Sequence, residues 1–529
     1  MKIALIFLYI PLPRSLFTSL RSYPYLSTVL SAKPASLSAK AASGYNHNPF
    51  LPMPENLNYW LVVIFLTVYF VIIIGAVYVV LSENRNPIRA LTWVIALIFL
   101  PGIGLIFYLF FGRSMKHLHM ISRHNKRKLL HSNPTRKLDL DDTGLSADSV
   151  QMAKMVNELS HSPLSLNNTL EIFTDGPTKF RELKRDLHNA TTSIWLQYYI
   201  FLDDDLGSEI ADILIEKARA GLDVKVIYDH VGSFSARNRF FKRMSDAGVD
   251  VHPFFRVTFP QLANRINWRN HRKIVVIDFE IGYIGGMNIA DRYDKGLPDG
   301  RVWRDTHFRV TGDVVRSLAL SFSIDWSFQK KHSLLPMHFR DLDPHAPGIG
   351  MQLITSGPTS SRENIVLAFL RAISSAKKSI YIQTPYFLPT DSLLQALEAA
   401  AAARVDVRVM IPCRPDSRLL RYASFSYVTQ CLKSGIKVYL YQPGMLHAKA
   451  MIIDDEMVTA GSCNFDFRSF ENNFEANLFI YNRGINRRMR DIFFADLAES
   501  RKLTYTEWHR RPSWQRAIES VTRLFAPIL

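Results

Sequence analysis

The chain has 529 residues, of which 64 are Lys or Arg and 47 are Asp or Glu, so its formal net charge is +17. That length allows two or three domains with substantial cores, and 48% apolar with 21% charged residues excludes a largely disordered chain. Three cysteines are too few for a disulfide scaffold, so we expect free thiols in a reducing compartment. The basic surplus predicts partners that carry phosphate or carboxylate, which could be nucleic acid or lipid.

Residues 1–56 form a leader whose composition differs from the rest of the chain. No acidic residue occurs before Glu55, and Ser and Ala are frequent. A weak signal peptide, a transit-like segment, or an extension before a start at Met53 would each explain this composition. The basic residues of the leader are Lys2, Arg14, Arg21, Lys33 and Lys40.

Two uncharged apolar runs follow, over 59–81 and 90–111. The first has 23 residues, enough to cross a hydrocarbon core of about 30 Å as a helix. The second contains Pro101 and Gly102, a break that a membrane helix tolerates when neighbours satisfy the freed backbone groups. We therefore expect a transmembrane hairpin over 57–112. The alternative is a pair of buried core helices.

A basic juxtamembrane linker is expected over 113–165. The positive-inside rule places this flank, and everything after it, in the cytoplasm. The same charges could hold anionic head groups, at about 1 kcal/mol for each basic residue. The cluster consists of Arg113, Lys116, Arg123, Lys126, Arg127 and Lys128.

The remaining chain alternates short β-rich runs with helical patterns, which predicts an α/β architecture. The expected strands cover 193–201, 223–229, 273–278, 379–387, 406–412 and 449–454. A final stretch places apolar residues at helical spacing among arginines, which suits either an interfacial amphipathic helix or a core-packing helix. Those apolar residues are Trp514, Ile518, Val521, Phe525 and Ile528.

This part of the chain is an internal repeat. DVKV at 223–226 recurs as DVRV at 406–409, and the segment 271–292 aligns without a gap to 447–468. A charged segment rich in Pro and Gly, 329–350, separates the copies. We therefore expect two pseudo-symmetric lobes, 166–345 and 346–529, with the amphipathic helix at the end of the second.

Both copies hold the pattern His-x-Lys-x4-Asp. One copy would be weak evidence, but each is followed at matching offsets by Gly, a small residue, Asn and Arg. The candidate catalytic residues are His271, Lys273, Asp278, His447, Lys449 and Asp454. The later positions hold Gly285 and Gly461, Gly286 and Ser462, Asn288 and Asn464, and Arg292 and Arg468.

These residue types favour phosphate chemistry. His and Lys two apart on a strand share a face, and a protonated Lys cannot ligate a metal but attracts phosphate. Asn288 and Asn464 add neutral donors to phosphate oxygens, so we expect both copies to converge on one phosphate, without a metal. Two histidines suit a two-step displacement in which one attacks phosphorus and the other protonates the leaving alkoxide.

Each histidine needs a carboxylate that orients its ring. Asp305 in the first copy and Glu475 in the second occupy aligned positions, in DTHFRV (305–310) and EANLFI (475–480). We expect these two residues to orient the histidines.

The duplicated motif resembles the hallmark of the phospholipase D superfamily, over about 166–500. More narrowly, 86–113, WRDTHFRVTG (303–312) and 512–525 look like the corresponding parts of bacterial cardiolipin synthases. The resemblance implies a two-lobed α/β sandwich, no cofactor, and a phosphohistidine intermediate. His271 would be the nucleophile and His447 the acid, with Asp278 and Asp454 mainly structural.

The resemblance also implies a substrate and a location. Two phosphatidylglycerols would become cardiolipin and glycerol, at the bacterial cytoplasmic membrane, with no nucleic acid as partner. The alternatives are a phospholipase D-type hydrolase, a membrane-tethered nuclease, or an inactive membrane scaffold. The oligomeric state is left open.

Overall fold

The computed structural model describes residues 55–82, 87–100, 102–112, 120, 143–257, 267–330, 334, 339 and 347–526. The chain divides into two units, 1–72 and 73–529. Residues 1–54 of the expected leader, and the expected basic cluster within 113–128, lie outside the described residues.

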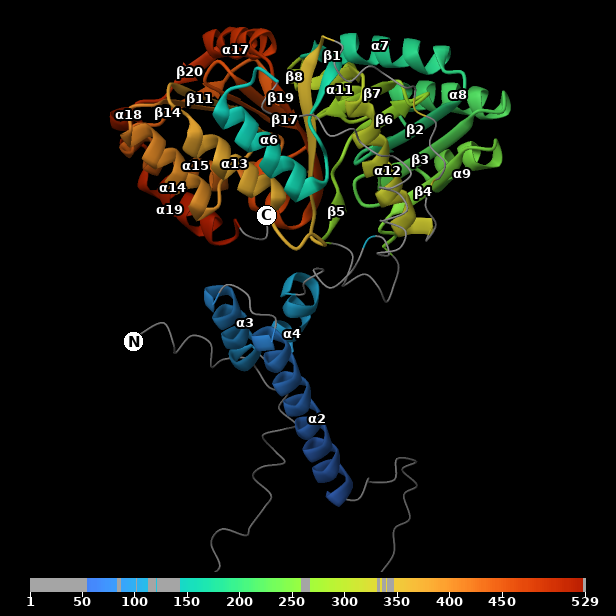
Figure 1. Ribbon diagram of the computed structural model, residues 1–529. Helices are drawn as coiled ribbons and strands as arrows, with labels where there is room; N and C mark the ends of the chain where they lie inside the picture. Colours follow the sequence, from blue (N-terminus) through green and yellow to red (C-terminus); the bar gives the residue numbers. More distant parts are fainter. Residues whose placement is uncertain are drawn as a thin grey trace, which may run out of the picture. The chain divides into compact units, whose positions relative to one another are not determined.

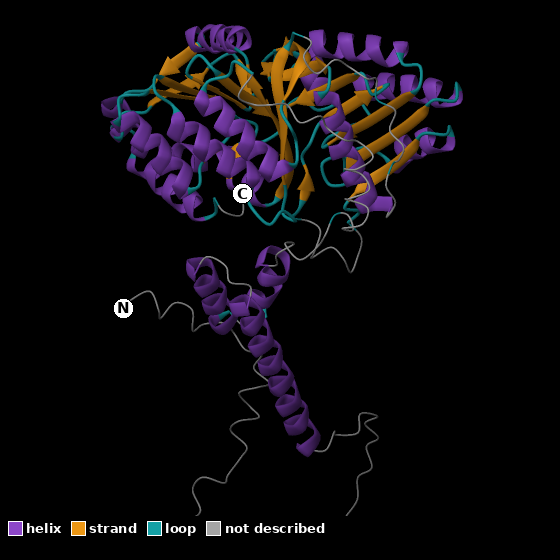
Figure 2. Ribbon diagram, viewed as in Figure 1, coloured by secondary structure: helices purple, strands orange, loops and turns teal. Residues whose placement is uncertain are grey.

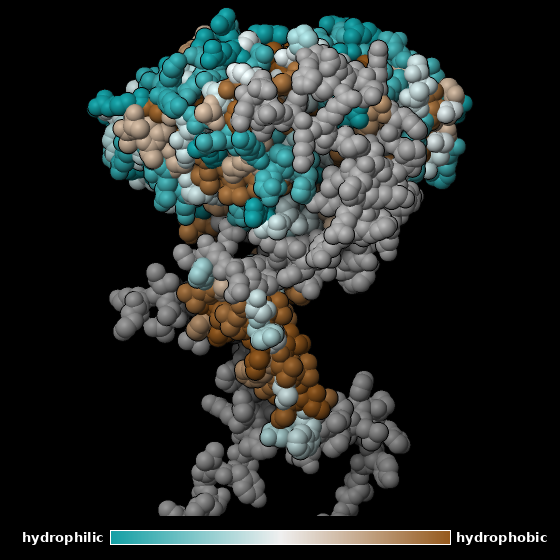
Figure 3. Space-filling view, viewed as in Figure 1, coloured by the Kyte–Doolittle hydropathy of each residue, from teal (hydrophilic) through white to brown (hydrophobic). Residues whose placement is uncertain are grey.

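Helix α2, Glu55–Ser82, contains the first apolar run. Its 24 residues from Tyr59 to Ser82 exceed the length needed to cross a membrane, and most of their side chains are exposed. The space-filling view shows mostly hydrophobic surface along this segment (Figure 3). Among the described residues, it is the one helix that is long and apolar enough to span a bilayer.

The second apolar run is divided between three short elements. They are α3 (Pro87–Phe99), α4 (Ile103–Phe107) and the π-helical turn η1 (Tyr108–Gly112). Gly102 lies in the left-handed region at φ 75°, and a Cβ at Gly104 would lie 2.3 Å from the carbonyl oxygen of Ala96. The chain therefore turns back on α3, and the expected second spanning helix over 90–111 is not a continuous helix.

A sheet of 16 strands, counted over the described residues, runs through the rest of the chain (Figures 1 and 2). In spatial order its first half is β4 (Asp250–Phe254), β3 (Asp223–Asp229), β2 (Ser193–Tyr198), β6 (Ile274–Ile277), β7 (Ile281–Gly285), β9 (His307–Thr311) and β1 (Ser165–Phe173). The second half continues with β10 (Ile349–Ser356), β19 (Asn473–Tyr481), β17 (Met457–Gly461), β16 (Ala450–Ile453), β11 (Ser379–Gln383), β13 (Asp406–Pro412), β14 (Lys437–Tyr441) and β20 (Ser500–Lys502). Apart from β20, the two orders mirror each other.

The duplication is thus visible in the strand order. The halves join where β1 and β10 pair antiparallel, near the middle of the sheet in Figure 1. The sixteenth strand, β5 (Arg269–Asn270), pairs with β19 away from this path. Each expected strand of the sequence analysis contains an observed one, so the α/β prediction is confirmed.

Helices cover both faces of the sheet. Because successive strand residues point to opposite faces, Trp195 packs in one core while Ile194 and Leu196 pack in another. The core shared by both halves lies under α12 (Val314–Lys330) and α17 (Arg483–Ala498). The opposite face carries one core for each half, under α7 (Gly176–Asn189), α8 (Asp205–Arg219) and α9 (Asn238–Asp246), and under α13 (Asn364–Ser375), α14 (Asp391–Ala402) and α15 (Arg418–Lys433).

Part of the segment expected as a linker is folded. Helix α6, Ala147–Ser160, buries Met152, Ala153 and Val156 in the core of the second half. Asp148 on its first turn pairs with Arg371 and Lys377. The second half therefore includes a helix that precedes the first half in sequence.

The C-terminal amphipathic stretch forms α19, Ser513–Leu524, which packs on α15. Its predicted apolar positions Trp514, Val521 and Phe525 are exposed. The side that packs is partly polar, with Glu519 buried and paired with Arg511. The alternative of an ordinary core-packing helix therefore does not describe these apolar residues.

Candidate active site

The backbone carries each motif histidine across to the other half of the repeat. Strand β5, just before His271, pairs with the start of β19, and β15 (Gly444–Leu446), just before His447, pairs with β8 (Val302–Arg304). The His271 N–H donates to the carbonyl of Phe474 at 3.0 Å, and the His447 N–H donates to that of Arg304 at 2.6 Å. Each acceptor immediately precedes a predicted orienting carboxylate.

Each carboxylate therefore contacts the motif histidine of the opposite half. Nδ1 of His271 lies 3.0 and 3.1 Å from the two carboxylate oxygens of Glu475, and Nδ1 of His447 lies 2.6 Å from Oδ2 of Asp305. Both carboxylates are fully buried. A carboxylate that accepts the Nδ1 proton leaves Nε2 with its lone pair free for chemistry. The structure brings together these four predicted residues, with partners exchanged between halves.

Both rings are neutral near pH 7. Burial lowers the pKa of His271 to about 4, against the opposing charge of Glu475. Burial likewise lowers the pKa of His447 to about 4, with the charge of Lys449 adding to the effect. Burial alone would raise the pKa of Asp305, but Lys449 and His447 outweigh it, so this carboxyl stays ionised. Neutral imidazoles beside ionised carboxylates are suited to nucleophilic attack.

The two motif lysines lie beside their histidines. Lys273 Nζ donates to the carbonyl of His271 at 2.6 Å, and Lys449 Nζ donates to that of His447. Burial lowers the pKa of Lys273 well below its usual value and lowers the pKa of Lys449 to about 8. Glu475 and Asp305 act on both lysines and oppose the effect of burial. A protonated lysine at either motif would attract the phosphate of a substrate.

The motif aspartates work at the far end of the same strands. Asp278 accepts hydrogen bonds from the N–H groups of Thr191, Thr192 and Ser193 at 2.8 to 2.9 Å. Asp454 does the same at the start of β11, through Ser379 and the two residues before it. Strands β6 and β16 separate these carboxylates from the histidines. The hydrogen bonds of Asp278 and Asp454 therefore connect neighbouring strands and do not reach the histidines.

The predicted phosphate-binding amides differ in their contacts. Asn288 accepts from the N–H of Ile200 at 3.2 Å and donates to the hydroxyl of Tyr293 at 2.7 Å. The buried Oδ1 of Asn464 has no hydrogen-bond partner among the described residues. One N–H of Asn288 is thus engaged in holding a tyrosine.

The small residues of the motif make room for the carboxylates. A Cβ at Gly286 would lie 2.1 Å from Oδ1 of Asp305, so only glycine fits there. At the equivalent position the Ser462 hydroxyl donates to Glu475. The sequence marked both positions as small, but it did not indicate that one of them binds a catalytic-site carboxylate.

The sequence analysis also missed the aromatic walls of the site. Tyr199 contacts the His271 ring at 4.8 Å between centroids, while Tyr293 and Trp303 contact His447 at 5.8 and 5.4 Å. Tyr199 lies just after strand β2, and Trp303 lies two residues before Asp305. The short distance in sequence between these aromatic residues and the candidate site residues was the signal that could have identified them.

A buried polar network stands behind His271. Arg272 donates to both oxygens of Asp325 at 2.8 Å, and Asp325 also accepts from Gln197. All three side chains are buried. The repeat places Ala448 opposite Arg272, but the second half has a comparable pair, in which Arg304 lies 2.8 Å from Asp496 and Asp496 accepts from Gln383 at 2.7 Å.

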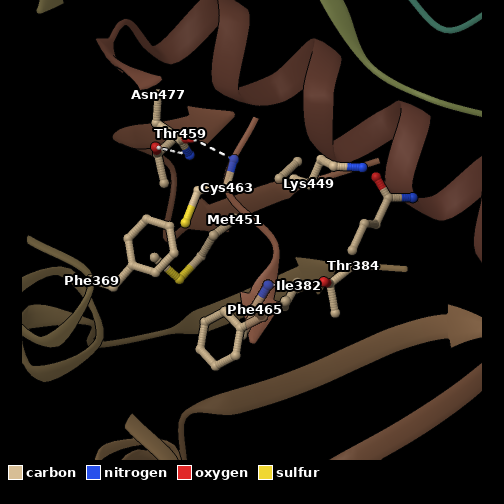
Figure 4. Close-up of a pocket in the computed structure, with 11 residues that line it drawn as sticks. Phe369, Ile382, Thr384, Lys449, Met451, Thr459, Cys463, Phe465 and Asn477 are labelled. Atoms are coloured by element: carbon tan, nitrogen blue, oxygen red, sulfur yellow. Dashed lines mark hydrogen bonds between the residues drawn. The ribbon is translucent and has the colours of Figure 1, made fainter. Parts of the chain in front are cut away.

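A small cavity lies behind Lys449 on the second half's side (Figure 4). Its lining is mostly apolar, with Phe369, Met451 and Phe465 around the thiol of Cys463. Burial raises the pKa of that thiol well above its usual value. This cavity is a packing defect of the core and offers no charged lining apart from Lys449.

Comparison with known proteins identifies the family. A model described as "Cardiolipin synthase, PLD-like domain" matches residues 183–294 and 369–497, and one described as "Phospholipase_D-nuclease N-terminal" matches 70–113. The chain is 39% identical over 479 residues to the major cardiolipin synthase ClsA of Bacillus subtilis, covering 88% of this chain and 99% of the relative. It is 37% identical over 477 residues to a cardiolipin synthase of Staphylococcus aureus, covering 88% and 96%.

The fold has a solved counterpart. The crystal structure of a phosphatidylserine synthase from Haemophilus influenzae superposes with a TM-score of 0.56 at 15% identity, covering 72% of this chain and all of that one. At that identity the likeness establishes the fold, a duplicated α/β architecture. With the extent of the curated matches, it follows that the chain belongs to the cardiolipin synthase family of phospholipase D-like proteins.

Proposed function

We propose that the protein is a membrane-bound phosphatidyltransferase that makes cardiolipin from two phosphatidylglycerol molecules and releases glycerol. The observation that carries the proposal is the pair of crossed histidine–carboxylate contacts, His271 with Glu475 and His447 with Asp305, flanked by two buried lysines. The names of relatives that match almost their full length support the same reaction.

In the first step, Nε2 of His271 attacks phosphorus and the bond from phosphorus to the glycerol oxygen breaks. His447 donates a proton to that oxygen. An entering phosphodiester brings a negative charge close to both rings, which favours the protonated form of one of them. Glu475 holds the attacking ring, and Lys273, Lys449, Asn288 and Asn464 stabilise the charge on the phosphoryl oxygens.

In the second step, His447 takes the proton from a hydroxyl of the second phosphatidylglycerol. That oxygen attacks phosphorus, the bond from phosphorus to His271 breaks, and cardiolipin forms. One phosphodiester replaces another, so the exchange needs no nucleotide to drive it. Asp278 and Asp454 contribute by fixing the strands that carry the motifs.

We further propose that α2 spans the cytoplasmic membrane, that the run 90–111 forms the second arm of a hairpin, and that the catalytic part faces the cytoplasm. The exposed apolar surface of α2 and the exposed apolar residues of α19 support membrane association. A cysteine introduced at Ser82 should then react with an impermeant thiol reagent in intact cells. A cysteine introduced at Lys242 should react only after permeabilisation, and the reverse pattern would contradict this orientation.

The activity is tested with the full chain in detergent, with labelled phosphatidylglycerol in the presence of EDTA. Cardiolipin and glycerol should appear in equal amounts, and the His271→Ala variant should form neither. Phosphatidic acid as the sole lipid product would identify a hydrolase instead, and no lipid turnover would favour a nuclease. Full activity of His271→Ala would contradict a role for the motif.

A further inference from the structure

Arg292 is a motif residue that the proposed reaction leaves without a task. It follows His271 by 21 positions, and the repeat places Arg468 at the equivalent position. Arg292 lies in the short helix α11, Asp291–Asp294, directly before Tyr293.

The guanidinium of Arg292 lies on the aromatic wall of His447. Its central carbon is 5.6 Å from the Tyr293 ring centroid and 5.3 Å from that of Trp303, the two rings that contact His447. Stacking of a planar guanidinium on aromatic faces restricts its orientation while leaving its N–H groups available. The side chain is only partly exposed. A positive charge is therefore held in a defined place on the His447 side of the site.

This charge has no anionic partner in the part of the chain that the structure describes. The buried Nε of Arg292 also lacks a hydrogen-bond partner there. The carboxylate next to it in sequence, Asp291, pairs with Lys295. An unsatisfied buried donor on a cation is costly, so the arrangement is suited to a bound anion.

We propose that Arg292 binds the phosphate of the second phosphatidylglycerol, the lipid whose hydroxyl accepts the phosphatidyl group. This inference rests on the proposed function. His447 there serves the alcohol side of the reaction, and the accepting hydroxyl is joined through a glycerol to that lipid's own phosphate. The phosphate of the accepting lipid is only a few bonds away from the hydroxyl that meets His447. It must therefore lie near His447, where the Arg292 guanidinium offers paired N–H donors.

The consequence is a selectivity for the acceptor. A free glycerol that attacks the phosphohistidine carries no phosphate and makes no use of Arg292. Phosphatidylglycerol as the acceptor does use it. Arg292 thus favours cardiolipin formation over return of the phosphatidyl group to glycerol.

The test compares two reactions of the same full-length protein in detergent micelles. One is cardiolipin formation from phosphatidylglycerol, and the other is incorporation of labelled glycerol into phosphatidylglycerol. Arg292→Gln should lower the first by about 10- to 100-fold, the loss expected when a charge-assisted contact disappears, and change the second less than about threefold. Arg292→Lys should recover part of the cardiolipin formation, since lysine keeps the positive charge but lacks the paired N–H donors of a guanidinium.

Arg243→Gln is the matched control, because Arg243 pairs with Asp212 on the exposed surface. It should leave both reactions unchanged. An equal loss of both reactions in Arg292→Gln, or no loss of either, would overturn the assignment. If the wild-type protein exchanges glycerol but makes no cardiolipin, the proposed function itself fails, which is a different outcome from unchanged acceptor selectivity in the variant.

Discussion

The two halves of the catalytic unit reach the same geometry around their histidines from different surroundings. In both, a short parallel pairing delivers the histidine to a carboxylate of the opposite half. Strand order and motif spacing are shared as well. The reacting groups are thus fixed by backbone pairing, which a duplication copies faithfully.

The side chains around the two histidines are copied only in part: each ring contacts an aromatic side chain and each half has an Arg–Asp pair, but the partners differ. His271 is backed by the buried Arg272–Asp325 pair, and its carboxylate accepts from the Ser462 hydroxyl. His447 faces the rings of Tyr293 and Trp303, and Lys449 Nζ lies 2.8 Å from its Nδ1. One ring contacts His271, whereas two rings contact His447. The duplication thus preserved the histidine–carboxylate geometry while the surrounding side chains changed, which would suit the different roles proposed for the two histidines.

The most decisive test of the difference between the halves is to separate nucleophilic attack by His271 from protonation of the leaving group by His447. With phosphatidyl-p-nitrophenol as donor the leaving group needs no proton. His447→Ala should then still release one equivalent of p-nitrophenolate per enzyme, while His271→Ala should release none. With phosphatidylglycerol both variants should lose activity by about 10³-fold or more, because each removes an essential group.

Quenched-flow measurement of p-nitrophenolate gives the size of the burst. The wild-type protein serves as the reference for one equivalent per site. A burst in His271→Ala and none in His447→Ala would exchange the two assignments. Equal bursts in both variants would remove the distinction between the halves.

The candidate residues of this site could be named from the sequence because they recur at matching spacings in the two copies. His271, His447, Asp305 and Glu475 could be identified by aligning the repeat with itself, since each position has a counterpart. The exchange of carboxylates between halves could not be predicted in this way. Alignment says which residues are equivalent, but it does not say which strand of one half lies beside which loop of the other.

The crossed pairing gives the next prediction. Glu475→Gln should resemble a weakened His271 variant, although Glu475 belongs to the same half as His447. Its burst should slow by about 10²- to 10⁴-fold, as expected when a histidine loses its orienting carboxylate. Asp305→Asn should keep a fast burst with the activated donor and slow only the alcohol-dependent steps.

Stopped-flow rates with the activated donor decide the matter. Gln and Asn preserve the volume of the replaced side chains, so the near-ultraviolet circular dichroism should not change. A slow burst in Asp305→Asn together with a fast one in Glu475→Gln would mean that each carboxylate serves the histidine of its own half.

Elements without a periodic or repeated signal were harder to predict. The uncharged run 90–111 has the composition of a membrane span, yet Gly102 and Gly104 allow the chain to turn back against α3. The segment 113–165 contains α6, whose apolar residues belong to a core that, after Leu164, draws its other buried residues from Ile354 onward. In both cases tertiary packing, and not local pattern, decides the structure.

Stability should depend more on the buried Arg272–Asp325 pair than on a partly exposed pair. Arg272→Met leaves Asp325 buried without its cation and should lower the free energy of unfolding by about 3 kcal/mol. Arg371→Met is the matched control, because its pair with Asp148 is partly exposed and contributes at most about 1 kcal/mol. The double variant Arg272→Met with Asp325→Leu should recover much of the loss. Urea unfolding in detergent, followed by tryptophan fluorescence, measures each difference, and equal effects of the two single variants would contradict a larger contribution of the buried pair.

The smallest expected effect concerns Lys449, whose pKa burial lowers to about 8. Below that pH the ammonium carries the charge that binds phosphate, and above it the charge is lost, so kcat/KM should fall about tenfold for each further pH unit. Lys449→Arg should move this fall in kcat/KM to higher pH, because a guanidinium keeps its proton throughout that range. Initial rates between pH 6 and 10 provide the measurement, with Lys377→Arg on the exposed surface as the control. A fall at unchanged pH in Lys449→Arg would show that the alkaline loss of activity does not come from deprotonation of Lys449.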